Sequence, residues 1–181
     1  GTSQGILGRG IVDWLAQPAG IRWLDVGCGT GILTRTILDR SDPASVVGVD
    51  PSQPFIDHAR EAVADPRVTF RIGTADSTWC DDASFDAVVA GLVHNFVPDL
   101  GAAMVEAQRV VRPGGIVAGY VWDYAAGMQL LRRFFEAAIA LDPEMRAHDE
   151  GVRFPITHEV RLAAAFEAAG LVEVNHRPID M

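Results

Sequence analysis

The spacing of apolar residues changes along the chain between the period of a helix and the period of a strand. Helical spacing of apolar side chains first appears in residues 4–17, and Pro18 and Gly20 end that pattern. Further helical patterns lie at about 32–39, 52–63, 99–111, 127–141 and 158–169. The apolar runs between them predict strands at residues 23–26, 46–49, 68–72, 85–90, 116–122 and 171–179.

This order of strands and helices predicts an α/β fold with a doubly wound, mostly parallel sheet flanked by helices. The run at 85–90 is almost wholly apolar, which is typical of a central parallel strand buried on both faces. The 181 residues suffice for one domain, and no repeat or low-complexity linker divides them. We therefore expect a single domain over residues 1–181.

A glycine-rich turn, DVGCGTG over residues 25–31, follows the first predicted strand and leads into a helix. Glycines at this spacing let the backbone approach a ligand closely at a helix N-terminus, although a purely structural turn can also use them. The carboxylate of Asp25 would repel a bound pyrophosphate but would attract an amino group or a sulfonium. Cys28, inside the turn, is expected to be a small space-filling side chain.

Asp50 ends the second predicted strand, 19 residues after Gly31. A carboxylate in this place can accept hydrogen bonds from both hydroxyls of a ribose. Taken alone, Asp50 could equally be a solvated charge on the loop to the next helix. Together with the glycine turn, it indicates a site for a nucleoside-containing ligand.

Four segments in register resemble the core of the class I S-adenosylmethionine-dependent methyltransferases, close to their small-molecule and quinone-type members. The segments are LDVGCGTG at 24–31, VDPS at 49–52, SFDAV at 84–88 and RVVRPGG at 109–115. Their order and intervals also match, and the resemblance covers residues 22–123, which is over half of the chain. It implies an enzyme that transfers a methyl group from S-adenosylmethionine to a small-molecule acceptor.

The resemblance also implies roles for individual residues. The turn would approach the methionine portion of the cofactor, Asp25 would lie near its amino group, and Asp50 would hold the ribose. The cofactor-binding positions carried over in this way are Asp25, Gly27, Cys28, Gly29, Gly31, Asp50, Pro51, Gly91 and Leu92.

The adenine contact departs from the family pattern. After the third strand, the family often carries Gly-Asp-Ala, whose acid meets the adenine amino group. This chain reads Gly73-Thr74-Ala75-Asp76, so a threonine stands at the acid position. Either Asp76 takes over this contact, or the Thr74 hydroxyl and the Ala75 backbone supply it.

The methyl acceptor is expected at the carboxyl edge of the sheet, where ligands bind in such folds. His94 and Asn95 follow the fourth predicted strand there. His94 is the candidate general base, and a packing role for this histidine is an equal alternative. Because methyl transfer is an in-line displacement, alignment of the two reactants can supply much of the acceleration without a base.

Composition excludes several other chemistries. All fifteen basic residues are arginines, which rules out lysine-dependent Schiff bases and phosphate-binding P-loops. The net charge of −9 disfavours nucleic acid as a partner. No spacing of Cys80 and the five histidines predicts a metal site. The chain has no apolar run long enough to span a membrane, and we expect a reducing cytoplasmic location.

Two other functions compete with methyl transfer. A methyltransferase-like domain could bind the cofactor without catalysis, because a fold does not fix a function. An NAD-dependent oxidoreductase would share the fold, but the spacing of Gly27, Gly29 and Gly31 differs from its fingerprint. By resemblance, the family's sheet has a seventh, antiparallel strand. Only six strands are predicted here, so we expect a domain truncated at its C-terminus.

Overall fold

The computed structural model describes residues 3–124, 127–154 and 159–179. Its sheet contains five strands, all parallel, in the order β3-β2-β1-β4-β5. They are β1 (Arg22–Val26), β2 (Ser45–Asp50), β3 (Val68–Ile72), β4 (Phe85–Gly91) and β5 (Val111–Tyr120). The expected doubly wound parallel fold is therefore confirmed.

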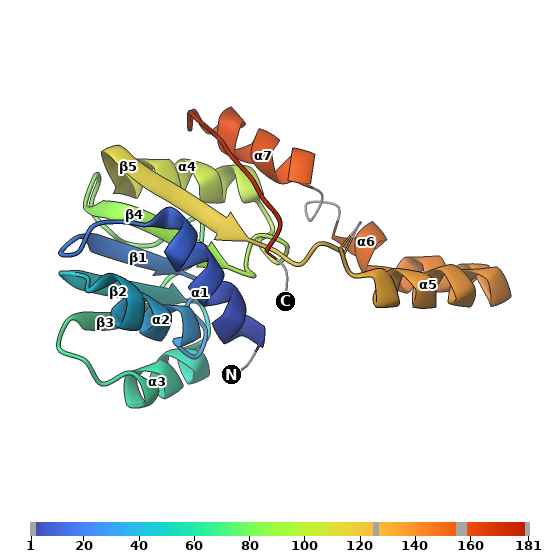
Figure 1. Ribbon diagram of the computed structural model, residues 1–181, viewed down its shortest axis with the longest axis horizontal. Helices are drawn as coiled ribbons and strands as arrows, with labels where there is room; N and C mark the ends of the chain where they lie inside the picture. The colour runs from blue at the N-terminus through green and yellow to red at the C-terminus, as the bar shows by residue number, and fades with distance from the viewer. Residues whose placement is uncertain (1–2, 125–126, 155–158, 180–181) are drawn as a thin grey trace.

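Helices cover both faces of the sheet (Figure 1). One face is covered by α1 (Ser3–Leu15), α2 (Ile32–Ser41) and α3 (Gln53–Ala62). The other face is covered by α4 (Leu100–Val110) and α7 (Glu159–Ala168), which also pack against each other. The strand order reverses between β1 and β4, so the carboxyl ends of these two strands form the switch point at which such folds bind ligands.

Strand alternation sends successive side chains of β1 to opposite faces. Trp23 is fully buried against α1 and α2, together with Ile11 and Ile37. Leu24 is fully buried on the α4 side with Val110. Because both faces are apolar, β1 is a central strand, and the position of its carboxyl end is fixed by packing on both sides.

The first four strands agree with the sequence prediction to within a residue or two at each end. The fifth begins at Val111, five residues earlier than predicted. Residues 113–115 precede the predicted strand, but they lie inside β5, where the ladder with β4 shifts register between Phe85 and Ala87. The irregularity accommodates the two glycines and the proline without ending the strand.

The prediction of a sixth strand at 171–179 is wrong, because this segment forms no ladder with any described strand. Its apolar residues bridge the two helical layers instead. Leu171 and Val174 pack with α4 and α7, whereas Ile179 packs with α1. Arg177 stacks on Trp14 of α1 at 4.9 Å from the ring centre. The apolar pattern therefore reflects packing against helices.

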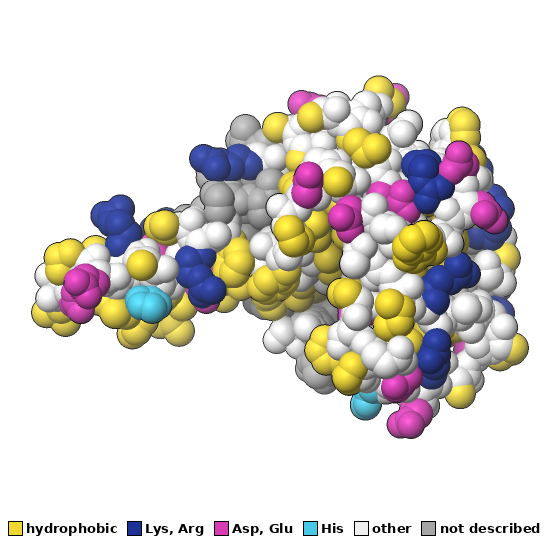
Figure 2. Space-filling model, turned by 180° about the vertical axis from the view of Figure 1, so that it is seen from behind, with side chains coloured by type: hydrophobic (Ala, Val, Ile, Leu, Met, Phe, Trp, Pro, Cys, Tyr) yellow, Lys and Arg dark blue, Asp and Glu magenta, His cyan; other side chains and the backbone are white. Residues whose placement is uncertain are grey.

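A helical arm projects from the body after β5 (Figure 1). It consists of α5 (Gln129–Leu141), the 3-10 helix η1 (Pro143–His148) and α6 (Glu150–Arg153), with η1 packed on both helices. Leu130 and Leu141 of α5 are 88% and 89% exposed. Figure 2 shows hydrophobic side chains along this arm. Ring contacts of Phe154 with Phe96 and Tyr124, at 5.4 and 5.9 Å, fasten its base to the sheet edge.

Candidate active site

The glycine turn lies at the carboxyl end of β1 and joins it to α2. Gly27, Gly29 and Gly31 have φ values of 67°, 52° and 84°, which is the left-handed region that favours glycine. A Cβ on Gly27 would lie 2.9 Å from Val93 Cγ1, so this position also requires glycine for space. A Cβ on Gly29 would have no atom within 4 Å. The turn therefore presents open backbone at Gly29.

Asp25 lies beneath the turn and is only 1% exposed. Its Oδ2 accepts a hydrogen bond of 2.6 Å from the Thr34 hydroxyl of α2, whereas Oδ1 is buried without a partner among the described residues. Burial raises the pKa of Asp25 to about 7, and the nearby Asp50 carboxylate contributes to the shift. A buried carboxylate with an unpartnered oxygen is well suited to bind a cation.

Asp50 ends β2 and is 7% exposed. Its Oδ2 accepts a hydrogen bond of 3.0 Å from the backbone N–H of Gly29. Its Oδ1 accepts one of 2.9 Å from the N–H of Ser52. These two bonds fix the carboxylate beside the glycine turn. Pro51 follows it on the surface.

The loop after β3 is tightened by a two-residue bridge between Thr74 and Ser77. Thr74 and Asp76 are exposed, and Ala75 is half-buried. All three therefore lie in one short turn next to the end of β2, where Gly73 donates to the Asp50 carbonyl at 3.3 Å. This arrangement leaves either of the predicted adenine contacts open to a ligand.

Sequence reasoning missed Glu106, a buried residue of α4 that holds this loop in place. Its Oε1 accepts hydrogen bonds from the backbone N–H and the hydroxyl of Thr78, at 2.9 and 2.6 Å. Arg109 donates to both oxygens of Glu106 and also pairs with Asp82. The spacing of Glu106 and Arg109 signals a helical ion pair, but nothing local reveals its burial.

Gly91 and Leu92 follow one another at the carboxyl end of β4. Leu92 has a φ of 61°, an uncommon backbone conformation for this residue type, and its N–H donates to the Tyr120 carbonyl at 2.8 Å. A Cβ on Gly91 would lie 2.5 Å from the Tyr120 hydroxyl oxygen. The backbone of β4 is therefore bare on the side facing Tyr120.

His94 is only 4% exposed and packs in the interior behind this edge. Its ring meets Phe166 of α7 edge-on at 5.9 Å and lies against Gly119, where an added Cβ would come within 2.8 Å of Nδ1. Burial lowers the pKa of His94 to about 4, so the ring is neutral at neutral pH. Nδ1 of His94 and both amide atoms of Asn95 are buried without a partner among the described residues.

Cys28 behaves as the space-filling side chain that was expected. It is 6% exposed, and its Sγ would lie 3.1 Å from a Cβ on Gly48. Burial raises the pKa of its thiol above the usual range, with smaller contributions from Asp25 and Asp50. The thiol is therefore protonated and poorly nucleophilic.

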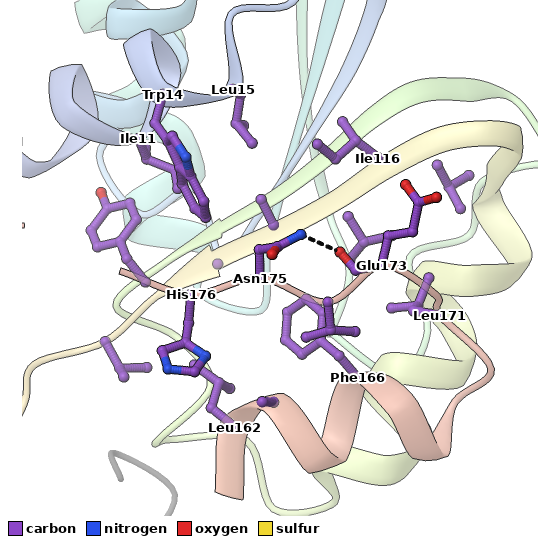
Figure 3. Close-up of a pocket in the computed structure, with 18 of the residues that line it drawn as sticks. Ile11, Trp14, Leu15, Ile116, Leu162, Phe166, Leu171, Glu173, Asn175 and His176 are labelled. Carbon is purple, nitrogen blue, oxygen red and sulfur yellow. Dashed lines mark hydrogen bonds between the residues drawn. The ribbon is translucent and has the colours of Figure 1, made fainter. Parts of the chain in front are cut away.

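A hollow of about 1460 Å³ lies away from the glycine turn. It adjoins the outer edge of β5 and is bounded by α1, α7 and residues 171–179. Figure 3 shows Ile11 and Trp14 on one side of it and Leu162 and Phe166 on the other. None of the predicted cofactor-binding residues lines it.

The described residues contain neither a metal-binding cluster nor a membrane-spanning helix. No group of histidine, cysteine, aspartate or glutamate side chains among them could hold a metal ion. In the same part of the chain, no helix is long and apolar enough to cross a membrane.

Comparison with protein families identifies the chain. Residues 24–119 match the family model described as a methyltransferase domain, and this segment contains the glycine turn, Asp50 and β4. The chain belongs to this methyltransferase family.

Curated relatives agree with the assignment. An uncharacterised methyltransferase of Mycobacterium bovis is 40% identical over 112 residues, which cover 62% of this chain and 44% of that protein. A demethylmenaquinone methyltransferase of Roseiflexus castenholzii is 32% identical over 180 residues, covering 92% of this chain and 74% of its own. Against the mycobacterial relative, the chain spans less than half of the protein's length.

Solved structures share the fold. A phosphoethanolamine N-methyltransferase of Haemonchus contortus, in complex with S-adenosyl-L-methionine, has a TM-score of 0.74 at 20% identity, covering 92% of this chain and 37% of its own. An S-adenosylmethionine-dependent methyltransferase of Mesorhizobium loti has a TM-score of 0.57 at 25% identity, covering 62% of this chain and 51% of its own. The Rossmann-like methyltransferase architecture is therefore shown.

Proposed function

We propose that this methyltransferase domain binds S-adenosylmethionine at the carboxyl ends of β1 and β2 and transfers its methyl group to a small molecule. One observation carries the proposal. The Asp50 carboxylate is fixed by the Gly29 and Ser52 N–H groups directly beside the open backbone of the glycine turn. This places an acceptor for ribose hydroxyls next to a bare stretch of backbone where the methionine portion can lie.

The buried Asp25 supports the same orientation of the cofactor. Its unpartnered Oδ1 lies beneath the turn, where an ammonium group would supply the missing partner. A pyrophosphate in this place would face two carboxylates, Asp25 and Asp50, which disfavours an NAD-like ligand. The residues present therefore fit the proposed cofactor better than a dinucleotide.

In the proposed reaction, the acceptor's nucleophilic atom forms a bond to the methyl carbon. The bond from that carbon to sulfur breaks, its electron pair stays on sulfur, and S-adenosylhomocysteine is released. The domain's contribution is to align the two reactants and exclude water. An acceptor that must lose a proton would pass it to solvent or to a base.

We assign His94 a packing role in preference to the alternative role of general base. The ring is neutral, but it is enclosed between Phe166 and Gly119, and its low pKa makes it a weak proton acceptor. The ring instead fills the space behind the carboxyl ends of β4 and β5. The methyl transfer proposed here uses alignment and requires no proton transfer to His94.

A small, uncharged acceptor suits the surface around the site. The net charge of −9 opposes nucleic acid, and Phe96 and Phe154 place aromatic rings at the carboxyl edge. The Roseiflexus relative is named as a demethylmenaquinone methyltransferase, which supports a small-molecule acceptor. The free cysteines, Cys28 and Cys80, suit a reducing compartment such as the cytoplasm.

Thermal unfolding with S-adenosylmethionine, S-adenosylhomocysteine and NAD tests the proposal. Either sulfur nucleotide, at about 100 times its Kd, should stabilise the fold by roughly 2.7 kcal/mol and raise Tm by several degrees. The shift should be lost in Asp50→Ala. It should persist in Asp57→Ala, which removes an exposed carboxylate of α3. A shift with NAD alone would refute the proposal.

A further inference from the structure

Tyr120, the last residue of β5, lies on the same face of the sheet as Asp25. Gly91 pairs with Tyr120, and Val89, two residues earlier on β4, pairs with Asp25. Strand alternation therefore puts Asp25, Val89, Gly91 and Tyr120 on one face. This is the face covered by α1 and α2, because Val89 and Tyr120 pack with those helices.

The phenol ring of Tyr120 lies across β4 in the space left by the missing side chain of Gly91. A Cβ on Gly91 would be 2.5 Å from the hydroxyl oxygen and 2.7 Å from Cζ. The ring thus reaches inward from the edge strand toward the centre of the sheet. Burial raises the pKa of Tyr120 above its usual range, and the negative charge of the Asp25 carboxylate adds to this effect.

Two polar oxygens at this place have no hydrogen-bond partner among the residues that the structure describes. Asp25 Oδ1 is buried without one, and the Tyr120 hydroxyl forms no side-chain hydrogen bond with another described residue. A purely structural ring here could be phenylalanine, which would avoid placing a hydroxyl near a carboxylate. Both oxygens can accept hydrogen bonds, and the negative field of Asp25 favours a cationic donor.

We propose that the Tyr120 hydroxyl, together with Asp25, binds the ammonium group of the amino-acid portion of the sulfur cofactor. Tyr120 is then the residue by which the site distinguishes a complete S-adenosyl amino acid from an adenosine thioether that lacks the amino acid. This assignment rests on the proposed function, because it deepens the description of the same cofactor site. It also explains why β4 ends in glycine at position 91.

The test compares Tyr120→Phe with the wild-type protein, using two ligands in calorimetric titrations. S-adenosylhomocysteine carries the ammonium group, whereas 5′-methylthioadenosine has the same nucleoside and thioether sulfur without the amino acid. Loss of one hydrogen bond to a charged group should weaken binding of S-adenosylhomocysteine by about 10- to 100-fold. Binding of 5′-methylthioadenosine should change by less than about twofold, since its contacts do not involve the hydroxyl.

Tyr124→Phe is the matched control, because Tyr124 is the second tyrosine at this edge and anchors the arm. It should leave both affinities unchanged. Equal weakening of both ligands by Tyr120→Phe, or no change in either, would overturn the assignment. A ligand-free melting curve of Tyr120→Phe that matches the wild type shows that the fold is intact. Failure of the wild type to bind either ligand would instead refute the proposed cofactor site, and the assignment of Tyr120 with it.

Discussion

Asp25 carries an energetic cost in the ligand-free protein that a bound cation would relieve. Its carboxyl group is buried, and among the described residues only Oδ2 has a hydrogen-bond partner. The folded protein therefore favours the protonated form, with a pKa of about 7 against an ordinary value of 3.8. Groups with strongly shifted pKa values are frequent at functional sites, where a bound ligand can supply the hydrogen bond or charge that the protein does not.

Replacement of Asp25 by asparagine should stabilise the ligand-free protein at neutral and higher pH. Between about pH 4 and pH 7 the unfolded chain loses the Asp25 proton while the folded protein keeps it, so wild-type stability falls as pH rises. The asparagine variant has no carboxyl group at this position, so its stability does not fall with pH for this reason. Its free energy of unfolding should exceed that of the wild type by an amount on the order of 2–4 kcal/mol at pH 8.

Urea denaturation of both proteins at pH 4.5 and pH 8 measures this difference, which should shrink toward the lower pH. The groups that face Asp25 are Thr34, Cys28, Asp50 and Tyr120, and they are common to both proteins. The buried His94 also contributes equally to both. A variant no more stable than the wild type at pH 8 would show that Asp25 is ionised without cost in the free protein.

Among the elements, the glycine turn offers a matched pair of substitutions. Gly29 and Gly20 both have positive φ, of 52° and 78°, and a Cβ on either would have no atom within 4 Å. Alanine at either position should therefore cost a similar backbone strain of about 1 kcal/mol. Only Gly29 borders the proposed cofactor site.

Gly29→Ala should weaken S-adenosylhomocysteine binding by at least about tenfold, because its methyl group would occupy space that the cofactor needs, whereas Gly20→Ala should bind normally. Calorimetric titration measures both affinities, and urea denaturation checks that the two losses of stability are alike. Equal affinity in the two variants would show that the turn is structural only.

The link between α4 and the loop after β3 depends on Glu106. Replacing Glu106 with glutamine leaves Arg109 facing a neutral amide and replaces one acceptor oxygen with a donor. We expect a loss of about 1–3 kcal/mol in the free energy of unfolding. Glu136→Gln, which affects only exposed ion pairs of the arm with Arg132 and Arg133, should cost little. Comparable losses in the two variants would contradict a structural role for the buried network.

Local patterns predict elements well where burial and sequence period agree. The apolar run at 85–90 predicts β4 because a central strand must be apolar on both faces. Aspartate is a favoured residue at the start of a helix, and the Asp99 side chain does accept a hydrogen bond of 2.9 Å from the Ala102 N–H at the start of α4. Residues 171–179 are a case in which the local pattern does not determine the structure. Their apolar pattern is typical of a strand, but a local pattern does not show whether a neighbouring strand is available for pairing. The segment packs on helices instead.

At the scale of the whole molecule, the site depends on the parallel arrangement of β1, β2 and β4. Asp25 and Asp50 are 25 residues apart in the chain and come together because both strands end at one edge. This much follows from sequence. The approach of Tyr120 across Gly91 does not, because it depends on the register between β4 and β5, including the shift near Phe85.

A ligand could lie at the carboxyl edge beside the glycine turn or in the hollow beside β5, and Tyr120 borders this hollow as well as facing Gly91. A crystal structure of the protein grown with S-adenosylhomocysteine decides between them. We predict ribose hydroxyls within hydrogen-bonding distance of Asp50, with the amino-acid portion over the glycine turn. A nucleoside seated instead in the hollow beside β5, with Asp50 uncontacted, would contradict the account.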